Sequence, residues 1–215
     1  MNIYVIIISF ITKKALAKMN NKRVENKFIF KSYDKYKIYN ALTNRGYKEM
    51  YEQRTVKSIY FDTINLQLYR DSLEGSVPRK KIRVRSYENI SNSLTKEEKK
   101  VTEEGRFKYS EKISNFPTHI IDDLHNLLFP KLDVRYKRLY FSNNIIRLTI
   151  DFDITYRSLE GGIVVNSPNL ILESKLLDKE NYSKKADDFK IFGSNNVSFS
   201  KYTDGINHVK FFRIN

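Results

Sequence analysis

Charged residues occupy every second position in six short segments of the chain, with mostly apolar or neutral residues between them. The segments are residues 23–27, 81–85, 97–99, 106–108, 147–153 and 173–175. Alternate side chains of a β-strand point to opposite faces, so each segment predicts a strand with one charged face. One such strand is an ordinary solvated sheet face. Six of them, mostly basic, predict a sheet that closes around a charged cavity suited to a polyanion.

The same patterning predicts about eight strands and three helices, mostly joined by hairpins, and therefore an antiparallel α+β protein. Ser32 and Gly46 bracket a helix over about 33–45. Apolar residues at helical spacing predict a second helix from about 120 that ends before Pro130. The predicted strands are 23–31, 56–62, 77–87, 94–101, 106–113, 134–141, 145–156 and 169–177, with a last short strand around 198–202, a helical turn at 65–72 and a polar helix near 182–192.

The apolar positions of two segments indicate how the sheet is oriented. Ile82 alternates with the basic residues of 81–85, and Leu148 and Ile150 alternate with the charged residues of 147–153. If these apolar faces pack outward against helices, the charged faces line the interior. Closure into a barrel would remove exposed sheet edges, and only a charged ligand or ordered water would stabilise a charged lumen.

Composition narrows the partner and the chemistry. The 215 residues fit one domain, with 39 Lys and Arg against 25 Asp and Glu and a formal net charge of +14. This excess favours an anionic partner such as nucleic acid, a phosphorylated metabolite, polyphosphate or lipid head groups. The absence of Cys excludes a disulfide framework and is compatible with the cytoplasmic location that we expect. With only three His, any metal is expected to have oxygen ligands.

The first residues form a separate segment in this interpretation. Residues 4–11 are strongly apolar but far shorter than the roughly 20 residues that a helix needs to cross a bilayer. Two lysines at 13–14 follow this stretch, which is the wrong order for a secretory signal. We therefore expect residues 1–22 to be a tail, with translation from Met19 and weak association with a membrane surface as alternatives. Residues 23–215 are expected to form one soluble domain.

A series of short motifs, in a fixed order, resembles a known family. They read Arg-Val-Glu-Asn-Lys-Phe at 23–28, Ser-Ile-Tyr-Phe-Asp-Thr at 58–63, Lys-Ile-Arg-Val-Arg-Ser-Tyr at 81–87, Glu-Glu-Lys at 97–99, Gly-Arg-Phe-Lys at 105–108, Tyr-Lys-Arg at 136–138, Arg-Leu-Thr-Ile-Asp at 147–151, Leu-Glu-Ser-Lys at 172–175 and Phe-Ser-Lys-Tyr at 199–202. Together they resemble the VTC domain, the polyphosphate polymerase domain of the vacuolar transporter chaperone family, in its compact bacterial form. The resemblance covers about residues 23–206.

The resemblance implies a triphosphate-tunnel fold, an antiparallel barrel whose bore carries basic residues and metal-binding carboxylates. Such domains transfer the γ-phosphate of ATP to a growing polyphosphate chain with Mn²⁺ or Mg²⁺. Relatives in the wider superfamily include tripolyphosphatases, thiamine triphosphatases, RNA triphosphatases and a class of adenylate cyclase, which usually begin with Glu-x-Glu-x-Lys. Here Arg23 occupies the first position. This departure favours the polymerase branch and removes one expected metal carboxylate.

The resemblance also assigns phosphate-binding roles to individual residues. Arg83 and Arg85 project to the same side of a strand, roughly 6–7 Å apart, and the planar fork of Arg binds phosphate oxygens in pairs. A solvated basic strand face is the alternative, and a charged surface hairpin is the alternative for Lys99, Arg106 and Lys108. The residues assigned to catalysis are Lys27, Arg83, Arg85 and Arg138, and those assigned to the polyphosphate chain are Lys81, Lys99, Arg106, Lys108, Arg147, Lys175, Ser200 and Lys201.

Three carboxylates are the candidate metal ligands. Glu173 lies in an otherwise apolar run, where an unpaired carboxylate is costly, and its counterpart in the family coordinates the divalent ion. Glu25 shares a strand face with Lys27, and a salt bridge to a neighbouring Arg is an equal alternative to metal binding. Asp151, with Asp153 beside it, is a candidate second ligand whose alternative role is to orient Arg147 by ion pairing.

Three classes of function remain open. The leading one is a metal-dependent polyphosphate polymerase that uses ATP. The second is a triphosphate hydrolase or cyclase of the same fold, and the third is a non-catalytic module that binds polyphosphate or another polyanion. No helix-turn-helix, zinc-finger or other nucleic-acid motif is present, so specific nucleic-acid binding ranks last.

Overall fold

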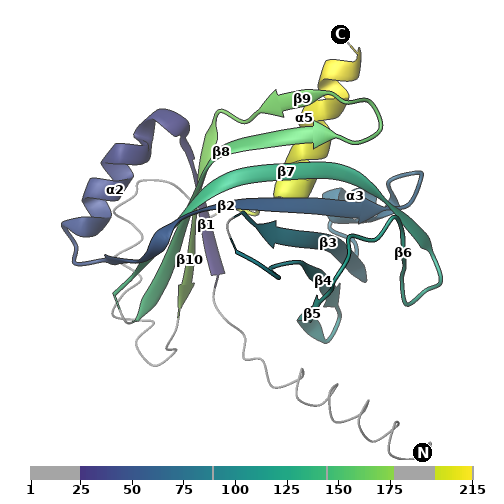
Figure 1. Ribbon diagram of the computed structural model, residues 1–215, viewed down its shortest axis with the longest axis horizontal. Helices are drawn as coiled ribbons and strands as arrows, with labels where there is room; N and C mark the ends of the chain where they lie inside the picture. Colours follow the sequence, from purple (N-terminus) through teal and green to yellow (C-terminus); the bar gives the residue numbers. More distant parts are fainter. Residues whose placement is uncertain (1–24, 89, 144, 177–196, 215) are drawn as a thin grey trace, which may run out of the picture.

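The computed structural model describes residues 25–88, 90–143, 145–176 and 197–214. Within these ranges strands predominate, and three α-helices and one 3₁₀ turn flank them (Figure 1). The elements, in chain order, are β1 (Glu25–Lys31), η1 (Ser32–Asp34), α2 (Lys35–Thr43), β2 (Lys48–Asp62), α3 (Gln67–Glu74), β3 (Arg79–Tyr87), β4 (Thr95–Thr102), β5 (Gly105–Lys112), β6 (Ile120–Ile121), β7 (Leu127–Ser142), β8 (Ile146–Ser158), β9 (Val164–Asn166), β10 (Asn169–Leu176) and α5 (Lys201–Ile214). None of these helices is long and apolar enough to cross a membrane, judged over the described ranges.

All strand pairs are antiparallel, and the sheet order is β1-β10-β8-β7-β2-β3-β4-β5, with β6 paired to β7 and β9 to β8. This confirms the antiparallel α+β class. The predicted closure into a barrel differs from the structure, because β1 and β5 are the two ends of the strand path and do not pair with each other in the described chain. Both end strands carry a lysine on the inner face, Lys27 on β1 and Lys108 on β5.

The apolar strand faces pack outward, as the sequence predicts. Leu148 and Leu172 from β8 and β10 form one buried cluster with Ile38 and Leu42 of α2, which lies at one end of the molecule (Figure 1). On β3, Ile82 and Val84 belong to a second buried cluster that includes Leu68 of α3. The charged residues that alternate with these positions therefore face the interior of the curled sheet.

Helix α5 covers part of this inner face. Tyr202, Ile206 and Val209 lie at helical spacing and are buried against β7 and β8 residues that include Val134 and Tyr156. Figure 1 shows the helix crossing behind these two strands. The prediction of a strand at 198–202 was therefore wrong. Phe199 precedes α5 and Tyr202 lies in its first turn, and the apolar residues that mark the buried side of this helix lie further along the chain.

A second prediction was also wrong. The residues expected to form a helix from about 120 to Pro130 form strand β6, a turn, and the start of β7. The Asp122 side chain accepts hydrogen bonds from the backbone N–H groups of Leu124 and Asn126, and these contacts stabilise the turn. Pro130 lies at a register shift of β7, where a missing N–H donor is tolerated. The polar helix expected near 182–192 lies outside the described residues.

Gly205 allows α5 to approach the sheet closely. A Cβ atom at this position would lie 2.6 Å from Cδ1 of Tyr156 and 2.7 Å from Cδ2 of Leu132, both fully buried. We expect Gly205→Ala to lower the free energy of unfolding by about 1–3 kcal/mol through overpacking, measured by urea denaturation. Gly161→Ala is the matched control, because its Cβ would meet nothing closer than 4.0 Å. Equal stability of the two variants would contradict the packing described for α5.

Candidate functional site

Two arginines of β3 are fixed on the inner face by neighbouring side chains. Arg83 donates from Nε to Glu97 at 2.7 Å and from Nη1 to the Tyr60 hydroxyl at 3.0 Å. Arg85 donates from Nε to the Ser58 hydroxyl at 3.3 Å. Burial alone would raise the pKa of Glu97, but Arg83, Arg85 and nearby Lys108 lower it well below its usual range. Glu97 therefore stays charged and holds the guanidinium groups in place.

Sequence reasoning did not select Glu97 as a site residue. The usable signal was its position on the same strand face as Lys99, two residues away. What the sequence does not contain is the register, which sets Glu97 directly opposite Arg83 of β3.

A row of three lysines crosses β3, β4 and β5. Lys81, Lys99 and Lys108 lie directly opposite one another in register. Lys108 pairs with Glu97 at 2.7 Å and Lys81 donates to the Ser200 hydroxyl at 3.0 Å, whereas Lys99 makes no hydrogen bond or ion pair with any described residue. Lys99 as a residue is exposed, and Glu25 and Glu173 attract it electrostatically without forming an ion pair with it. Lys81 and Lys99 thus have no ion-pair partner in the described part of the protein.

Burial and neighbouring positive charge lower the pKa values of two of these lysines. The pKa values of Lys81 and Lys99 are both lowered from 10.5 to about 8. Burial is the largest cause of this lowering, and the positive charges of Lys27 and Arg83 add to it. Burial would raise the pKa of Tyr60, but Arg83, Arg85 and Lys201 together lower it to about 8. A bound anion would stabilise all of these cations.

The strands on the other side of the interior hold a second set of charged groups. Asp151 of β8 is fully buried and accepts from Arg138 Nε at 2.5 Å and Nη2 at 2.7 Å, and from Lys201 Nζ at 2.5 Å. The alternative role of Asp151 in orienting Arg147 is not what the structure shows, because its partners are Arg138 and Lys201. With both oxygens bonded to cations, Asp151 is poorly placed to bind a metal.

Asp153 does not continue the inner face, contrary to the alternation in the sequence. It is the extra residue of a β-bulge, with φ of 50°, and it pairs on the outer surface with Lys137 at 3.0 Å. Beyond the bulge, Ile154 and Tyr156 take the inward positions and pack against α5. The bulge therefore divides the inner face of β8 into a charged half and an apolar half.

Glu25 and Glu173 meet on the neighbouring strands β1 and β10. Their carboxyl groups interact with each other, while Lys27 lies 3.8 Å from Glu25 and Lys175 lies 2.8 Å from Glu173. Burial would raise the pKa of Glu173, but Lys175, the neighbouring Glu25 side chain, and the nearby cations Lys27 and Arg138 lower it well below its usual range. Oxygen donors in such a pair have the chemistry that Mg²⁺ and Mn²⁺ prefer.

The three predicted metal ligands are not all brought together. The described residues contain no group of three or more His, Cys, Asp or Glu side chains placed to hold a metal ion. Glu25 and Glu173 form a pair, and Asp151 is engaged with cations instead. The carboxylate pair fits an ion that takes its remaining ligands from phosphate oxygens and water.

The segment that precedes α5 links the two sides of the interior. Lys27 Nζ donates to the backbone oxygen of Phe199 at 2.9 Å, Lys81 bonds Ser200, and Lys201 bonds Asp151. In the described residues, the inner side carries ten cationic side chains and four carboxylates. The cations are Lys27, Lys81, Arg83, Arg85, Lys99, Lys108, Arg138, Arg147, Lys175 and Lys201, and the carboxylates are Glu25, Glu97, Asp151 and Glu173. Arg106 lies on the same face of β5 but is exposed at its end. Most of the predicted set therefore gathers around one interior.

The motif at 58–63 supports this arrangement at three points. Ser58 and Tyr60 contact Arg85 and Arg83, as described above. Asp62 accepts from the backbone N–H groups of Leu68 and Tyr69 at the start of α3, and from the hydroxyl of Tyr202. Tyr202 also stacks on Tyr60 with ring centroids 4.9 Å apart. One strand end thus fixes α3, α5 and both arginines.

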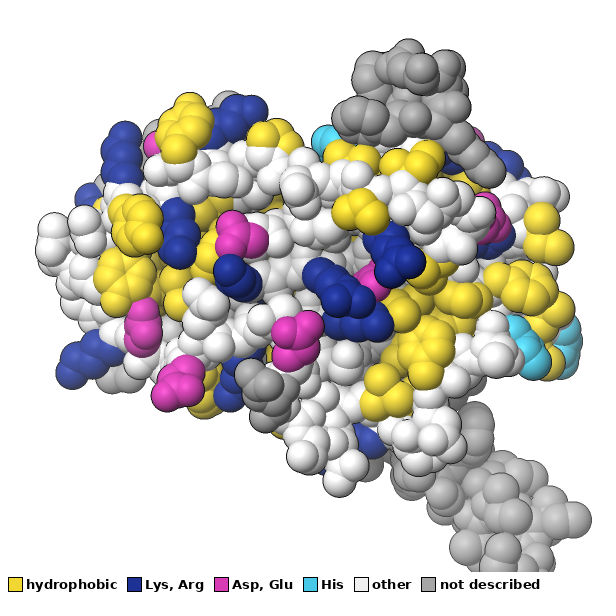
Figure 2. All heavy atoms as spheres, turned by 45° about the horizontal axis from the view of Figure 1, so that its top comes forward, with side chains coloured by type: hydrophobic (Ala, Val, Ile, Leu, Met, Phe, Trp, Pro, Cys, Tyr) yellow, Lys and Arg dark blue, Asp and Glu magenta, His cyan; other side chains and the backbone are white. Residues whose placement is uncertain are grey.

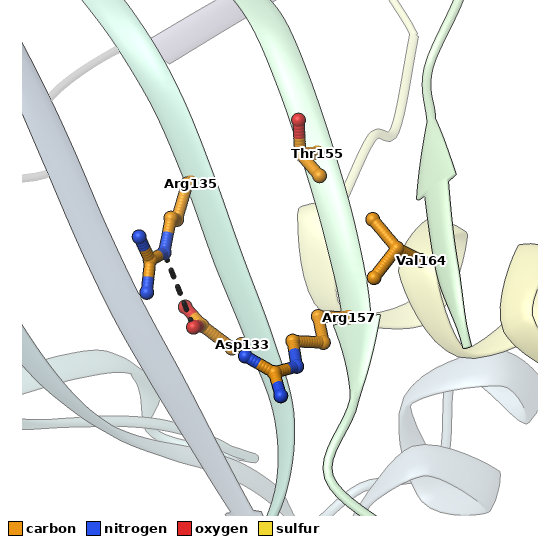
Figure 3. Close-up of a pocket in the computed structure, with 5 residues that line it drawn as sticks. All are labelled: Asp133, Arg135, Thr155, Arg157 and Val164. Carbon is orange, nitrogen blue, oxygen red and sulfur yellow. Dashed lines mark hydrogen bonds and ion pairs between the residues drawn. The ribbon is translucent and has the colours of Figure 1, made fainter. Parts of the chain in front are cut away.

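The outer face of the sheet is electrostatically different. A pocket of about 220 Å³ is lined there by Asp133, Arg135, Thr155, Arg157 and Val164, and Arg135 is paired with Asp133 at 3.3 Å (Figure 3). Figure 2 shows basic and acidic side chains interspersed over the displayed face. On this displayed face the two signs of charge are mixed, whereas cations outnumber carboxylates by ten to four on the inner face of the described chain.

The family model described as the VTC domain matches residues 10–126 and 118–210. The chain belongs to the VTC domain family. No curated protein sequence matches it.

Solved structures show the same fold. A Bacillus halodurans protein described as a candidate adenylate cyclase is 17% identical, with a TM-score of 0.55, over 83% of this chain and 94% of that one. A candidate adenylyl cyclase from Hippeastrum, reported to have a dominant triphosphatase activity, is 15% identical, with a TM-score of 0.53, over 86% and 96% of the two chains. A Vibrio parahaemolyticus protein, also a candidate adenylate cyclase, is 14% identical, with a TM-score of 0.53, over 86% and 97%. This VTC domain therefore has the fold of triphosphate-tunnel proteins.

The lowered pKa values predict opposite effects of pH on anion binding and on stability. Between about pH 8 and 9.5, Lys81 and Lys99 lose protons and Tyr60 gains negative charge, so the affinity for tripolyphosphate should fall. In the same range the unfolded chain binds more protons than the folded one, so stability should rise with pH. Above about pH 10, Tyr156 and Tyr202, whose pKa values burial raises, reverse that trend.

Two titrations check this prediction: calorimetric binding of tripolyphosphate and urea unfolding without ligand, each at several pH values between 7.5 and 9.5. Affinity and stability that both fall with pH would contradict the assignment of uncompensated lysines to the inner face.

Proposed function

We propose that this VTC domain is a metal-dependent polyphosphate polymerase that transfers the γ-phosphate of ATP to a growing polyphosphate chain in its interior. The observation that carries the proposal is that Lys81 and Lys99, which have no ion-pair partner in the described chain, lie beside the fixed Arg83 and within electrostatic reach of Glu25 and Glu173. Phosphoryl transfer depends mainly on positioning and on neutralising charge on phosphate oxygens. An interior of this composition supports both.

Each group has a role within this proposal. Arg83, Arg85 and Arg138 bind the oxygens of the triphosphate, and Lys27 binds the phosphate that is transferred. Glu97 acts as a positioning residue, since it orients Arg83 from 2.7 Å and keeps the guanidinium from rotating. Donors fixed in advance stabilise developing charge without reorganisation at the moment of reaction.

The pairing of the carboxylates favours polymerisation over hydrolysis. A terminal phosphate oxygen of the growing chain attacks the γ-phosphorus, the bond to the bridging oxygen of ADP breaks, and no proton has to be removed from the nucleophile. Hydrolysis needs a base or an acceptor that positions water. In the described chain, Glu25, Glu97, Asp151 and Glu173 are each paired with a cation, which leaves none of them as a free base.

Glu25 and Glu173 are the residues that would hold the divalent ion. When bound, Mn²⁺ or Mg²⁺ supplies charge neutralisation and orientation of phosphate oxygens. The chain contributes the two carboxylates and the lysines beside them, Lys27 and Lys175, which balance their charge while the ion is away.

The test is incubation of the purified protein with ATP and Mn²⁺, with ADP, orthophosphate and polyphosphate measured separately. Polymerisation predicts ADP release matched by phosphate incorporated into long chains on a gel. ADP matched by orthophosphate would instead show hydrolysis, the activity reported for the Hippeastrum protein, and cyclic AMP with pyrophosphate would show a cyclase. Salt-sensitive polyphosphate binding without turnover would identify a binding module. Each of these three results would overturn the proposal.

A further inference from the structure

Two buried hydrogen-bond donors on β8 have no acceptor among the described residues. The hydroxyl of Thr149 and the Nε–H of Arg147 are both inaccessible to solvent and make no hydrogen bond within that part of the chain. The two residues are two positions apart on one strand and therefore share the inner face, with their Cα atoms roughly 6–7 Å apart. Buried donors are nearly always satisfied, so two adjacent exceptions in a charged interior point to a missing acceptor.

The surroundings of these donors define where that acceptor lies. In register, Thr149 is directly opposite Glu173 of β10 and Tyr140 of β7. The guanidinium of Arg147 lies 5.7 Å from the centroid of the Tyr140 ring, so it leans toward Thr149. Glu173 accepts a hydrogen bond from neither donor, and its ion-pair partner is Lys175 at 2.8 Å.

The chemistry of the donors excludes a cation as the missing partner. Arg147 is positively charged and its Nε can only donate, and the Thr149 hydroxyl can also act as a donor. A phosphate group offers several strong acceptor oxygens and negative charge, and arginine binds it with charge-assisted hydrogen bonds. The place lies across the sheet from the lysine row, next to Glu25 and Glu173.

We propose that Thr149 and Arg147 form a distinct phosphate position, in which the Thr149 hydroxyl and the Arg147 Nε–H bind one phosphate group of the substrate chain beside the Glu25–Glu173 pair. This inference rests on the proposed function and deepens it by adding Thr149 to the substrate-binding residues. A polyphosphate then spans the interior from Lys81 and Lys99 on one side to Thr149 on the other.

The test compares Thr149→Val with Thr149→Ser by calorimetric titration with inorganic tripolyphosphate, without nucleotide. Val has the shape of Thr but no hydroxyl, so we expect an affinity about 10- to 100-fold lower, the range for a lost hydrogen bond to a charged group. Thr149→Ser keeps the hydroxyl and should bind within about threefold of the wild type. Thr155→Val, on the outer face of the same strand, is the control and should bind as the wild type does.

Stability separates a ligand-binding role from a structural one. Because the Thr149 hydroxyl is buried without a partner, its removal should leave the unfolding midpoint unchanged or raise it. If Thr149→Val bound tripolyphosphate as tightly as the wild type, the hydroxyl would hold only water and the inference would be overturned. A loss of affinity accompanied by a lower unfolding midpoint would also overturn it, because the hydroxyl would then have a structural role.

The inference and the proposed function fail in different ways. A wild-type protein that makes polyphosphate while Thr149→Val binds normally removes the phosphate position alone. A wild-type protein that releases only orthophosphate while Thr149→Val binds poorly removes the polymerase proposal and keeps the phosphate position.

Discussion

Replacing Arg83 by glutamine is expected to lower kcat/KM for ATP by about 100- to 1,000-fold, the loss seen when one fixed donor to transition-state charge is removed. Arg83 is held by Glu97 and Tyr60 and lies among the interior cations. Glutamine keeps a polar side chain but loses the charge and the planar fork that binds phosphate oxygens in pairs. Initial rates of ADP release at several ATP concentrations measure the effect.

The control is Arg135→Gln on the outer face, where the side chain is half-exposed and pairs only with Asp133 among the described residues. We expect its kcat/KM to stay within about twofold of the wild type. Urea unfolding checks that Arg83→Gln is folded, since Arg85 and Lys108 still compensate the buried Glu97. Comparable losses in the two arginine variants would mean that the inner face is not the site.

Replacing Glu173 by glutamine is expected to have two effects of opposite sign. The concentration of Mn²⁺ needed for half-maximal activity should rise about tenfold or more, because one of two carboxylate ligands is lost. Tripolyphosphate should bind more tightly without metal, because Lys175 loses its partner at 2.8 Å and Lys27 and Arg138 lose a nearby negative charge. Activity titrations with Mn²⁺ and calorimetry in EDTA measure the two effects.

Glu111→Gln is the control for this variant, because Glu111 is an exposed carboxylate of β5. It should leave both the metal requirement and the metal-free affinity unchanged. Weaker binding of tripolyphosphate to Glu173→Gln in EDTA would contradict this account. It would mean that the Glu173 carboxylate does more than bind the divalent ion and neutralise the neighbouring lysines.

The alternation of charged and apolar residues was sufficient to predict the strands and the direction in which they face. Lys81, Arg83 and Arg85 lie inside and Ile82 outside because a strand has period two and the apolar side packs against helices. The pattern failed at Asp153, where a bulge shifts the period and moves the carboxylate to the outer surface. A bulge depends on how two strands twist together, and one strand's sequence does not record it.

Pairing inside the site was harder to predict than the site itself. Whether Asp151 serves a metal, Arg147 or Arg138 depends on cross-strand register, and the structure selects Arg138 together with Lys201. Lys201 was expected on a strand, but it begins α5, whose apolar stripe extends through Ile206 and Val209. The open sheet likewise reflects the absence of pairing between β1 and β5 in the described chain, and these two strands lie far apart in the sequence.

The most direct test of the central claim is the reactivity of individual lysines, followed by mass spectrometry after brief acetylation at pH 8 with and without tripolyphosphate. Lys81 and Lys99, with pKa values of about 8, should react readily in the free protein and be protected about tenfold or more by tripolyphosphate. Lys137, half-exposed on the outer face, should react equally in both conditions. Protection of Lys137 with Lys81 and Lys99 unprotected would place the anion on the outer surface and contradict the interior site.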